Sequence, residues 1–159
     1  MSAEQPVFEL AQVNIARALA PLDSPQLADF VDNLDRINAV ADRAPGFVWR
    51  LQDESGNATD IQIDDDPLLI VNLSVWQSQQ ALEDFAYRTA HKKIFERRQA
   101  WFEAPKGPHL ALWWVPAGHR PDVAEAMAKL ALLAEQGPSP EAFTFKQAYP
   151  APGASVAAE

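Results

Sequence analysis

The chain has 159 residues, which fits a single domain, and a formal net charge of −9 at pH 7. The negative charge argues against nucleic acid and anionic membranes as partners, because both bind clustered Lys and Arg, and the absence of cysteine excludes disulfides, thiolate nucleophiles and cysteine metal sites. The N-terminal residues lack the basic and apolar regions of a signal peptide, and no stretch approaches the roughly 20 apolar residues of a membrane span, so we expect a soluble cytoplasmic protein.

The first part of the chain predicts two strands separated by an amphipathic helix. Residues 7–15 alternate and are rich in β-branched side chains, which indicates a strand. Apolar residues recur at steps of three and four over 26–43, which predicts a helix, and Ser24-Pro25 is a typical N-cap followed by a first helical residue. A second strand is expected over 47–51. The polar residues 53–66 are expected to form a long hairpin connection.

The centre of the chain predicts a strand that leads directly into a long helix. Residues 68–76 form a nearly continuous apolar run, as in a strand covered on at least one face. Residues 77–102 contain no Gly or Pro and many good helix formers, so we expect one helix, capped by Ser74 or Ser78. Its apolar stripe shifts along its length, which predicts a bend or a change of partner between Phe85 and Ala90.

One stripe of this predicted helix combines cationic and aromatic side chains. Tyr87, His91 and Arg98 fall on it at helical spacing, and Trp101 flanks it. Cationic groups on a buried face need a carboxylate, a ligand or water, because an unpaired buried charge is costly. Two interpretations are open: His91 moves a proton while Arg98 holds an enolate, phenolate or carboxylate, or the pair forms a structural network with acidic groups.

The last part of the chain predicts a strand, an additional helix and a short final strand. The strand covers 110–116, the helix runs from 122 to about 135, and the final strand lies within 140–149. Residues 150–159 are small and proline-containing, so we expect a disordered tail. The folded domain should therefore span 7–149.

The order of these elements predicts an α+β fold. It is the ferredoxin-like split βαβ arrangement, an antiparallel sheet with its two main helices on one face. The strands over 68–75 and 110–115 are too apolar for the other face to be left in water. A second copy of the chain is the simplest cover, so we expect a homodimer.

The histidines and tryptophans define the remaining candidates. His91, His109 and His119 show no HxH, HxxxH or histidine–carboxylate spacing, so no metal site is expected. His119 either fixes a turn or acts as an acid or base at the mouth of a pocket. Trp113 and Trp114 are adjacent in a strand and should point to opposite faces, one of them toward a pocket. The sequence shows neither a Gly-rich phosphate loop nor a serine elbow.

Two sets of motifs carry a resemblance to known proteins. The segment that begins Asn72-Leu-Ser-Val-Trp-Gln-Ser78 and ends Arg97-Arg98 and Trp101-Phe102 resembles the core of the dimeric α/β barrel superfamily, which includes antibiotic-biosynthesis and heme-degrading monooxygenases. Residues 113–121 and 137–143 are similar to an uncharacterised domain-of-unknown-function family within it. This resemblance implies a dimer whose two sheets pack into a barrel, with a pocket between each sheet and its helices.

The resemblance does not imply a heme site. Heme-degrading members use an asparagine on the first strand, a tryptophan on the helix and a histidine that ligates iron. Asn14 matches the asparagine, but Phe85 stands at the tryptophan position and His91 comes earlier than the heme histidine would. We therefore expect no bound cofactor.

The resemblance to cofactor-independent, quinone-forming monooxygenases implies a pocket with asparagine, tryptophan and tyrosine. Asn14 or Asn72, together with Trp76 and Tyr87, offers these residue types. The first functional hypothesis is an enzyme that oxygenates, or transfers protons on, a small, flat, partly anionic aromatic or polyketide-like molecule. The alternative is a non-catalytic small-molecule-binding or interaction module. The candidate catalytic residues are His91, Arg98 and Tyr87, and the candidate substrate-binding residues are Asn14, Trp76, Trp101, Trp113 and His119.

Overall fold

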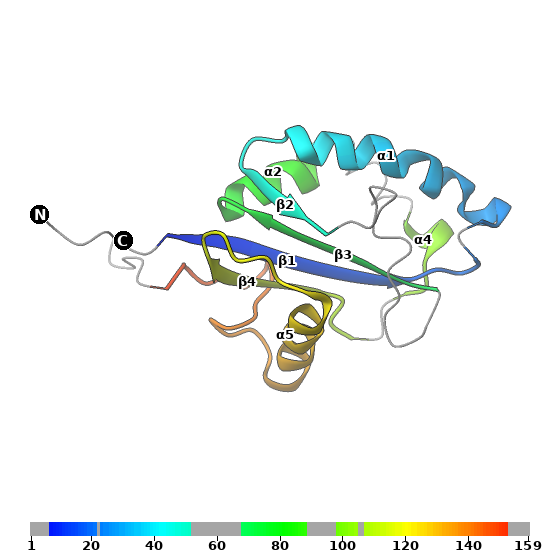
Figure 1. Ribbon diagram of the computed structural model, residues 1–159. Coiled ribbons are helices and arrows are strands. Elements are labelled where there is room, and N and C mark those ends of the chain that lie inside the picture. The colour runs from blue at the N-terminus through cyan, green and yellow to red at the C-terminus, as the bar shows by residue number, and fades with distance from the viewer. Residues whose placement is uncertain (1–6, 22, 52–67, 89–97, 105–106, 153–159) are drawn as a thin grey trace, which may run out of the picture.

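A four-stranded antiparallel sheet forms the centre of the computed structural model (Figure 1), which describes residues 7–21, 23–51, 68–88, 98–104 and 107–152. Its strands lie in the order β2-β3-β1-β4. They comprise β1 (Phe8–Arg17), β2 (Phe47–Arg50), β3 (Leu69–Trp76) and β4 (Leu110–Pro116). The long strands β1 and β3 pair in the middle, from Leu10 opposite Trp76 to Arg17 opposite Leu69.

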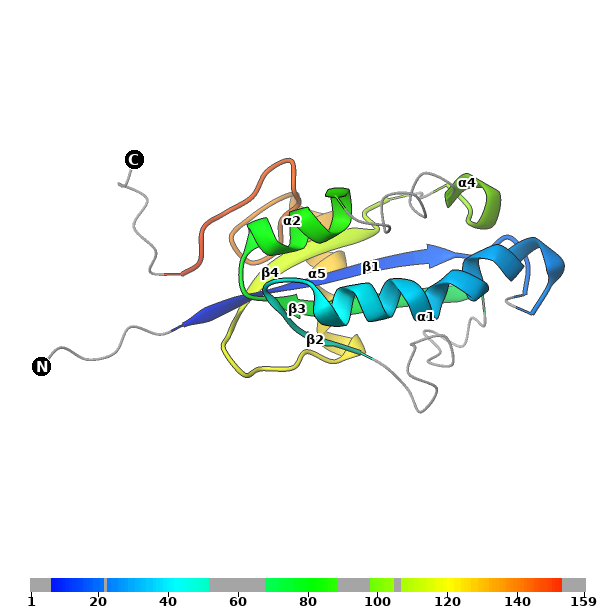
Figure 2. The same cartoon turned by 90° about the horizontal axis from the view of Figure 1, so that it is seen from above.

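Helices cover both faces of this sheet. On one face lie α1 (Ala28–Arg43) and α2 (Gln79–Arg88), side by side along the strands (Figure 2). On the other face lies α5 (Val123–Gln136) (Figure 1). With the strand order above, the sequence β1-α1-β2-β3-α2-β4 is the ferredoxin-like split βαβ fold, which confirms the predicted α+β class.

Strand alternation decides which side chains meet which helices. Successive side chains of a strand point to opposite faces. In β1, Ala11 and Val13 therefore join the cluster that contains Leu130 of α5, whereas Leu10 joins the cluster that contains Ile37 of α1.

The face for which the sequence predicts a second copy of the chain is covered by α5 of the same chain. Ala126, Leu130 and Leu133 of α5 pack against it. Eight of its strand residues are at most 3% exposed within the single chain; they are Ala11, Val13, Val71, Leu73, Val75, Ala111, Trp113 and Val115. The physical reason given above for a partner chain is therefore wrong, because the additional helix fills that role.

The homodimer itself stays a prediction, supported now by the resemblance alone. A specific interface should bury more than about 1,000 Å² in total. Sedimentation equilibrium at micromolar concentration is expected to give twice the chain mass. A monomer under these conditions would contradict the prediction.

The predicted helix over 77–102 corresponds to two described helices. Helix α2 ends at Arg88, and the short α4 (Arg98–Trp101) follows the residues 89–97, which lie outside the described part together with most of the predicted bend. The hydroxyl of Ser78 accepts a hydrogen bond from the backbone N–H of Ala81 at 3.1 Å, so Ser78 rather than Ser74 caps this helix.

Ser24 occupies the predicted N-cap position, with Pro25 at the start of the first turn, but without the expected side-chain hydrogen bond. The chain enters α1 through a 3₁₀ turn (Pro25–Leu27). Proline supplies the fixed φ of that first turn, and the backbone N–H of Leu27 donates to the backbone oxygen of Ser24 at 3.2 Å. The Ser24 hydroxyl is buried without a partner among the described residues.

The predicted final strand over 140–149 is also absent from the described structure. Phe143 forms a single antiparallel bridge with Leu112, using hydrogen bonds of 2.8 and 2.9 Å. A tight bridge between Ser139 and Ala142 turns the chain just before it, so only one residue pairs with β4. The side chain of Phe143 is fully buried on the α1–α2 face. The predicted tail falls mostly on residues 153–159, outside the described part.

Gly46 lets the start of β2 approach α2 closely. Its φ is +84°, a conformation that side chains other than glycine disfavour. A Cβ at this position would lie 2.4 Å from the Cβ of Ala81. The close contact sets α2 beside the start of β2, where Phe47 begins one wall of the site described below.

A glutamate joins the start of α5 to the buried side of β4. Asp122 caps the helix by accepting a hydrogen bond from the backbone N–H of Glu125 at 2.8 Å. The Glu125 carboxylate accepts a hydrogen bond from the indole N–H of Trp113 at 2.9 Å, and its other oxygen lies 2.7 Å from Nε2 of His119. Trp113 is 1% exposed, so its N–H has no access to water as a substitute acceptor.

Replacing Glu125 by Ala should lower the free energy of unfolding by about 1–3 kcal/mol, because the buried indole N–H of Trp113 loses its acceptor. Urea unfolding followed by tryptophan fluorescence measures the change. Glu135→Ala, at an exposed position in the last turn of the same helix, is the matched control and should stay within about 0.5 kcal/mol of the wild type. Equal stability of the two variants would refute this role of Glu125.

Candidate functional site

A cavity of about 940 Å³ lies between the sheet and the helices α1 and α2. Its walls are largely aromatic and aliphatic, and its volume is in the range typical of small-molecule sites. Side chains from both helices, from β2 and from the segment after α4 form these walls; they include Phe30, Leu34, Ile37, Phe47, Phe85 and Phe102.

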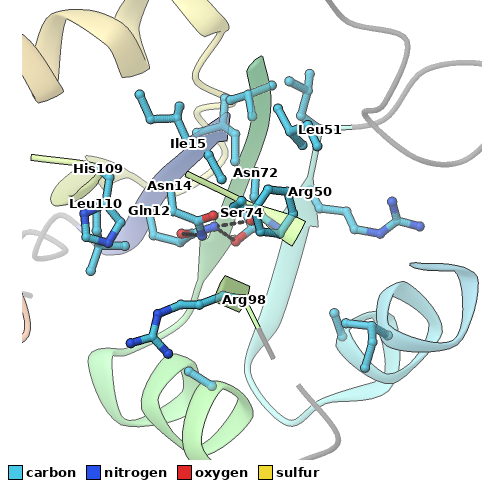
Figure 3. Close-up of a pocket in the computed structure, with 18 of the residues that line it drawn as sticks. Gln12, Asn14, Ile15, Arg50, Leu51, Asn72, Ser74, Arg98, His109 and Leu110 are labelled. Carbon is cyan, nitrogen blue, oxygen red and sulfur yellow. Dashed lines mark hydrogen bonds between the residues drawn. The ribbon is translucent and has the colours of Figure 1, made fainter. Parts of the chain in front are cut away.

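The floor of the cavity is a row of polar side chains on the sheet. Gln12 and Asn14 of β1 face Ser74 and Asn72 of β3, because each pair is directly opposite in the strand register. Arg50 of β2 pairs with Ser74 and extends the row on one side. Figure 3 shows these side chains in line, with His109 next to the β1 residues, on the side opposite Arg50. The row thus crosses the sheet at right angles to its strands.

Hydrogen bonds connect the four central residues, which we call the polar row (Gln12, Asn14, Asn72 and Ser74). The side-chain amide nitrogen of Gln12 donates to Asn72 Oδ1 at 2.6 Å and to Ser74 Oγ at 2.7 Å. Asn14 Nδ2 donates to Gln12 Oε1 at 3.1 Å. Gln12 is therefore hydrogen-bonded to each of the other three residues, and it is only 4% exposed.

Trp76 is held in a single orientation at one end of the polar row. Its indole stacks on Phe85 with ring centroids 5.2 Å apart and meets the edge of Phe47 at 5.3 Å. Its N–H donates to Ser74 Oγ at 2.8 Å. The hydroxyl of Ser74 therefore receives hydrogen bonds from both Trp76 and Gln12 in a position that is 6% exposed.

The ionisable side chains that line the cavity are mostly cationic. Arg17, Arg50 and Arg98 line it among the described residues, together with one carboxylate, that of Glu103. Arg17 forms an ion pair with Glu103. Arg50 binds Asp42 with a 2.8 Å hydrogen bond from Nε. Two of the three lining arginines are therefore already paired with carboxylates.

The structure brings three of the predicted site residues to the cavity. Asn14, Trp76 and Arg98 line it, as does Asn72, the alternative to Asn14. His91 lies outside the described residues, and so does the side chain of Tyr87. Their proposed catalytic roles therefore stay predictions.

The other three predicted site residues do not line this cavity. Trp101 is buried in a neighbouring cluster, where its ring lies 5.5 Å from that of Phe30. Trp113 and His119 lie on the α5 side of the sheet, where both bind Glu125. His119 therefore belongs to the connection between β4 and α5 rather than to a pocket mouth.

The two adjacent tryptophans do point to opposite faces, as strand alternation predicts. Trp113 belongs to the cluster with α5, and Trp114 packs against the cluster with α1 and α2. Trp114 donates its indole N–H to the backbone oxygen of Tyr149 at 2.9 Å, and neither ring lines the cavity.

Sequence reasoning missed Gln12, Ser74, Arg50 and His109 as lining residues. A signal for the first two was present, because Gln12 shares the parity of Asn14 in one strand and Ser74 shares that of Asn72 in another. Polar residues at alternate positions of two otherwise apolar strands indicate a polar site on one face of the sheet.

Two further classes of site have no support in the part of the chain that the structure describes. No three His, Cys, Asp or Glu side chains there are grouped closely enough to hold a metal ion. None of the helices described is long and apolar enough to cross a membrane.

Comparison with known protein families matches residues 9–159 to the family described as "Domain of unknown function (DUF3291)". The chain belongs to the DUF3291 family. The resemblance to an uncharacterised domain-of-unknown-function family is thereby confirmed. None of the curated proteins matches this DUF3291 chain.

Three solved structures are similar to the DUF3291 chain over most of their own length. PA3566 from Pseudomonas aeruginosa is 17% identical, with 73% of this chain and 100% of that chain covered and a TM-score of 0.47. NE2512, a protein of unknown function from Nitrosomonas europaea, is 12% identical (74% and 97% covered, TM-score 0.45). A candidate antibiotic biosynthesis monooxygenase from Nitrosomonas europaea is 16% identical (74% and 95% covered, TM-score 0.43). Likenesses at this level carry no argument about activity.

Replacing Ser74 by Ala should lower the free energy of unfolding by about 1–3 kcal/mol, because the buried N–H groups of Trp76 and Gln12 lose their shared acceptor. Chemical denaturation measures this loss. Ser139→Ala is the control, since Ser139 Oγ makes only a 3.3 Å hydrogen bond to an exposed backbone N–H, and it should change stability by less than about 0.5 kcal/mol. If the two variants were equally stable, the polar row would not depend on Ser74.

Proposed function

We propose that this DUF3291 protein binds a small, flat, partly anionic molecule in the cavity and acts on it as a monooxygenase-like enzyme without a bound cofactor. The observation that supports the proposal is the polar row, a hydrogen-bonded set of four side chains on the floor of an otherwise largely apolar cavity. Apolar walls with a few placed polar groups are the usual composition of a small-molecule site.

The walls favour a conjugated, aromatic ligand. Phe30, Phe47, Phe85 and Phe102 line the cavity from four different elements or segments. Aromatic rings bury large apolar areas and interact favourably with other rings in offset or edge-on arrangements. Oxygen substituents on such a ligand can reach the polar row, and a negative charge on one of them is favoured by the arginines of the lining.

The proposed reaction requires a substrate that reacts with dioxygen once it has lost a proton. An anthrone is an example: its ring CH₂ group and O₂ become the C=O group of an anthraquinone and one water molecule. The protein would bind the enolate oxygen through hydrogen bonds and Arg98, and it would hold the ring in place during the attack by oxygen. His91 and Tyr87 stay the predicted proton-transfer groups.

A non-catalytic binding module is the second candidate. It is favoured because the described lining offers no buried, unpaired group for proton transfer. The Glu103 carboxylate is paired with Arg17, and His109 is exposed. The size of the cavity favours small-molecule binding, with or without catalysis, over an interaction module, which would more simply fill this space with side chains.

Turnover of anthrone tests the enzyme hypothesis directly. The wild type is expected to accelerate both oxygen uptake and the appearance of anthraquinone absorbance. Arg98→Ala should reduce kcat/KM about 10- to 100-fold, the range for losing one charge-assisted hydrogen bond to the reacting oxygen.

Arg120→Ala is the matched control, since it removes the same charge near Glu9, away from the cavity. It should leave the rate unchanged. Binding of anthrone without acceleration would favour the binding module. An absence of both binding and turnover for anthrone and related phenols would contradict the proposed function.

A further inference from the structure

The hydrogen-bonding capacity of Ser74 is fixed by its neighbour on the same strand. The indole nitrogen of Trp76 can only donate. It lies 2.8 Å from Ser74 Oγ, so one lone pair of that oxygen is always occupied. Ser74 retains one further lone pair and its own hydroxyl hydrogen, and the amide of Gln12 at 2.7 Å takes one of the two.

The orientation of the Gln12 amide follows from a count of its hydrogens. One end of the amide contacts both Asn72 and Ser74, and the other end contacts Asn14 alone. With nitrogen toward β3, both N–H groups have acceptors. With nitrogen toward Asn14, one N–H would have no acceptor among the described residues, although the side chain is only 4% exposed. An unpaired buried N–H is the costlier defect, so the nitrogen faces β3.

This orientation determines what the polar row offers on the β3 side. Ser74 Oγ then accepts two hydrogen bonds, and only its hydroxyl hydrogen is left to donate. Asn72 uses Oδ1 to accept from Gln12, so its NH₂ group is left as a donor. Asn72 is an exposed residue that lines the cavity, and no hydrogen-bond partner for this NH₂ group lies within the described part of the chain.

We propose that Gln12 is the specificity-determining residue of this site: it makes Ser74 and Asn72 donors toward the ligand, so that the cavity selects a molecule with a carbonyl, phenolate or carboxylate oxygen over β3. This inference rests on the proposed function, because it concerns the ligand of the same cavity. A ligand that presents only N–H or O–H donors there would leave both protein donors unpaired, which costs affinity.

The arginines of the lining act in the same direction. A guanidinium group such as that of Arg98 binds an anionic oxygen more strongly than a neutral one. The donor groups, however, should discriminate even between uncharged ligands, which separates the effect of Gln12 from that of the net charge.

A pair of neutral probes of equal shape isolates this effect. 2-Acetylnaphthalene carries a carbonyl oxygen where 2-isopropenylnaphthalene carries a CH₂ group. Equilibrium dialysis with the wild-type protein is expected to give a dissociation constant about 3- to 10-fold lower for the ketone, the range for one net hydrogen bond. Equal affinities for the two probes would overturn the inference.

Gln12→Glu reverses the polarity of the row with little change in shape. A carboxylate at this position can only accept, so Ser74 and Asn72 must turn their donors toward it and away from the ligand. The preference for the ketone should then fall to about one. Gln136→Glu makes the same chemical change at an exposed position on α5, on the far side of the sheet, and should keep the wild-type preference.

Asn72→Asp is a second variant for the case that Gln12→Glu does not fold, as checked by circular dichroism. Asn72 is exposed, and Asp keeps the acceptor for Gln12 while it removes the donors toward the ligand. It should weaken ketone binding and leave binding of the hydrocarbon within about twofold of the wild type.

The outcomes separate this inference from the proposed function. Binding of both probes with an unchanged preference in Gln12→Glu, or in Asn72→Asp where Gln12→Glu is unfolded, would overturn the role of Gln12 and leave the binding site standing. Failure of the wild type to bind either probe would count against the proposed function and against this inference together.

Discussion

The hydroxyl oxygen of Ser74 joins the two central strands to the indole of Trp76, and the geometry of the cavity depends on this pair of hydrogen bonds. Gln12 can reach Ser74 only because β1 and β3 place the two residues directly opposite. A shift of one residue would move Gln12 to the α5 face, where it would meet apolar side chains. The register of the central strands therefore determines both the orientation of Trp76 and the arrangement of the polar row on the floor of the site.

The two faces of the sheet have different roles. The α5 face carries an apolar cluster, and α5 packs on it within a single chain. The α1–α2 face combines apolar packing at one end, around Trp76 and Phe85, with a cavity above the polar row. Buried polar groups are tolerated on that face because hydrogen bonds satisfy them. The apolar cluster on the α5 face thus stabilises the fold, while the other face leaves room for a ligand.

Membership of the DUF3291 family assigns no activity, so the chemistry of the site carries the functional argument. The polar row supplies fixed dipoles inside largely apolar walls, and three arginines line the same cavity. Fixed donors in an enclosed site stabilise developing negative charge on oxygen without reorganising. The proposed monooxygenase-like chemistry and the proposed selection for a carbonyl or anionic oxygen both require this property.

Local patterns in the sequence were sufficient for the order of elements, the ferredoxin-like fold and the opposite directions of Trp113 and Trp114, because helix and strand periodicity is a property of neighbouring residues. Asn14 and Trp76, named from the resemblance, and Arg98, named from its helix stripe, line the cavity, while their roles toward a ligand stay predictions. Only the tertiary structure decided that α5 covers the second face and that Gln12 bonds Ser74, a residue 62 positions away. Such contacts depend on strand register and on the packing of distant elements, which no local period encodes.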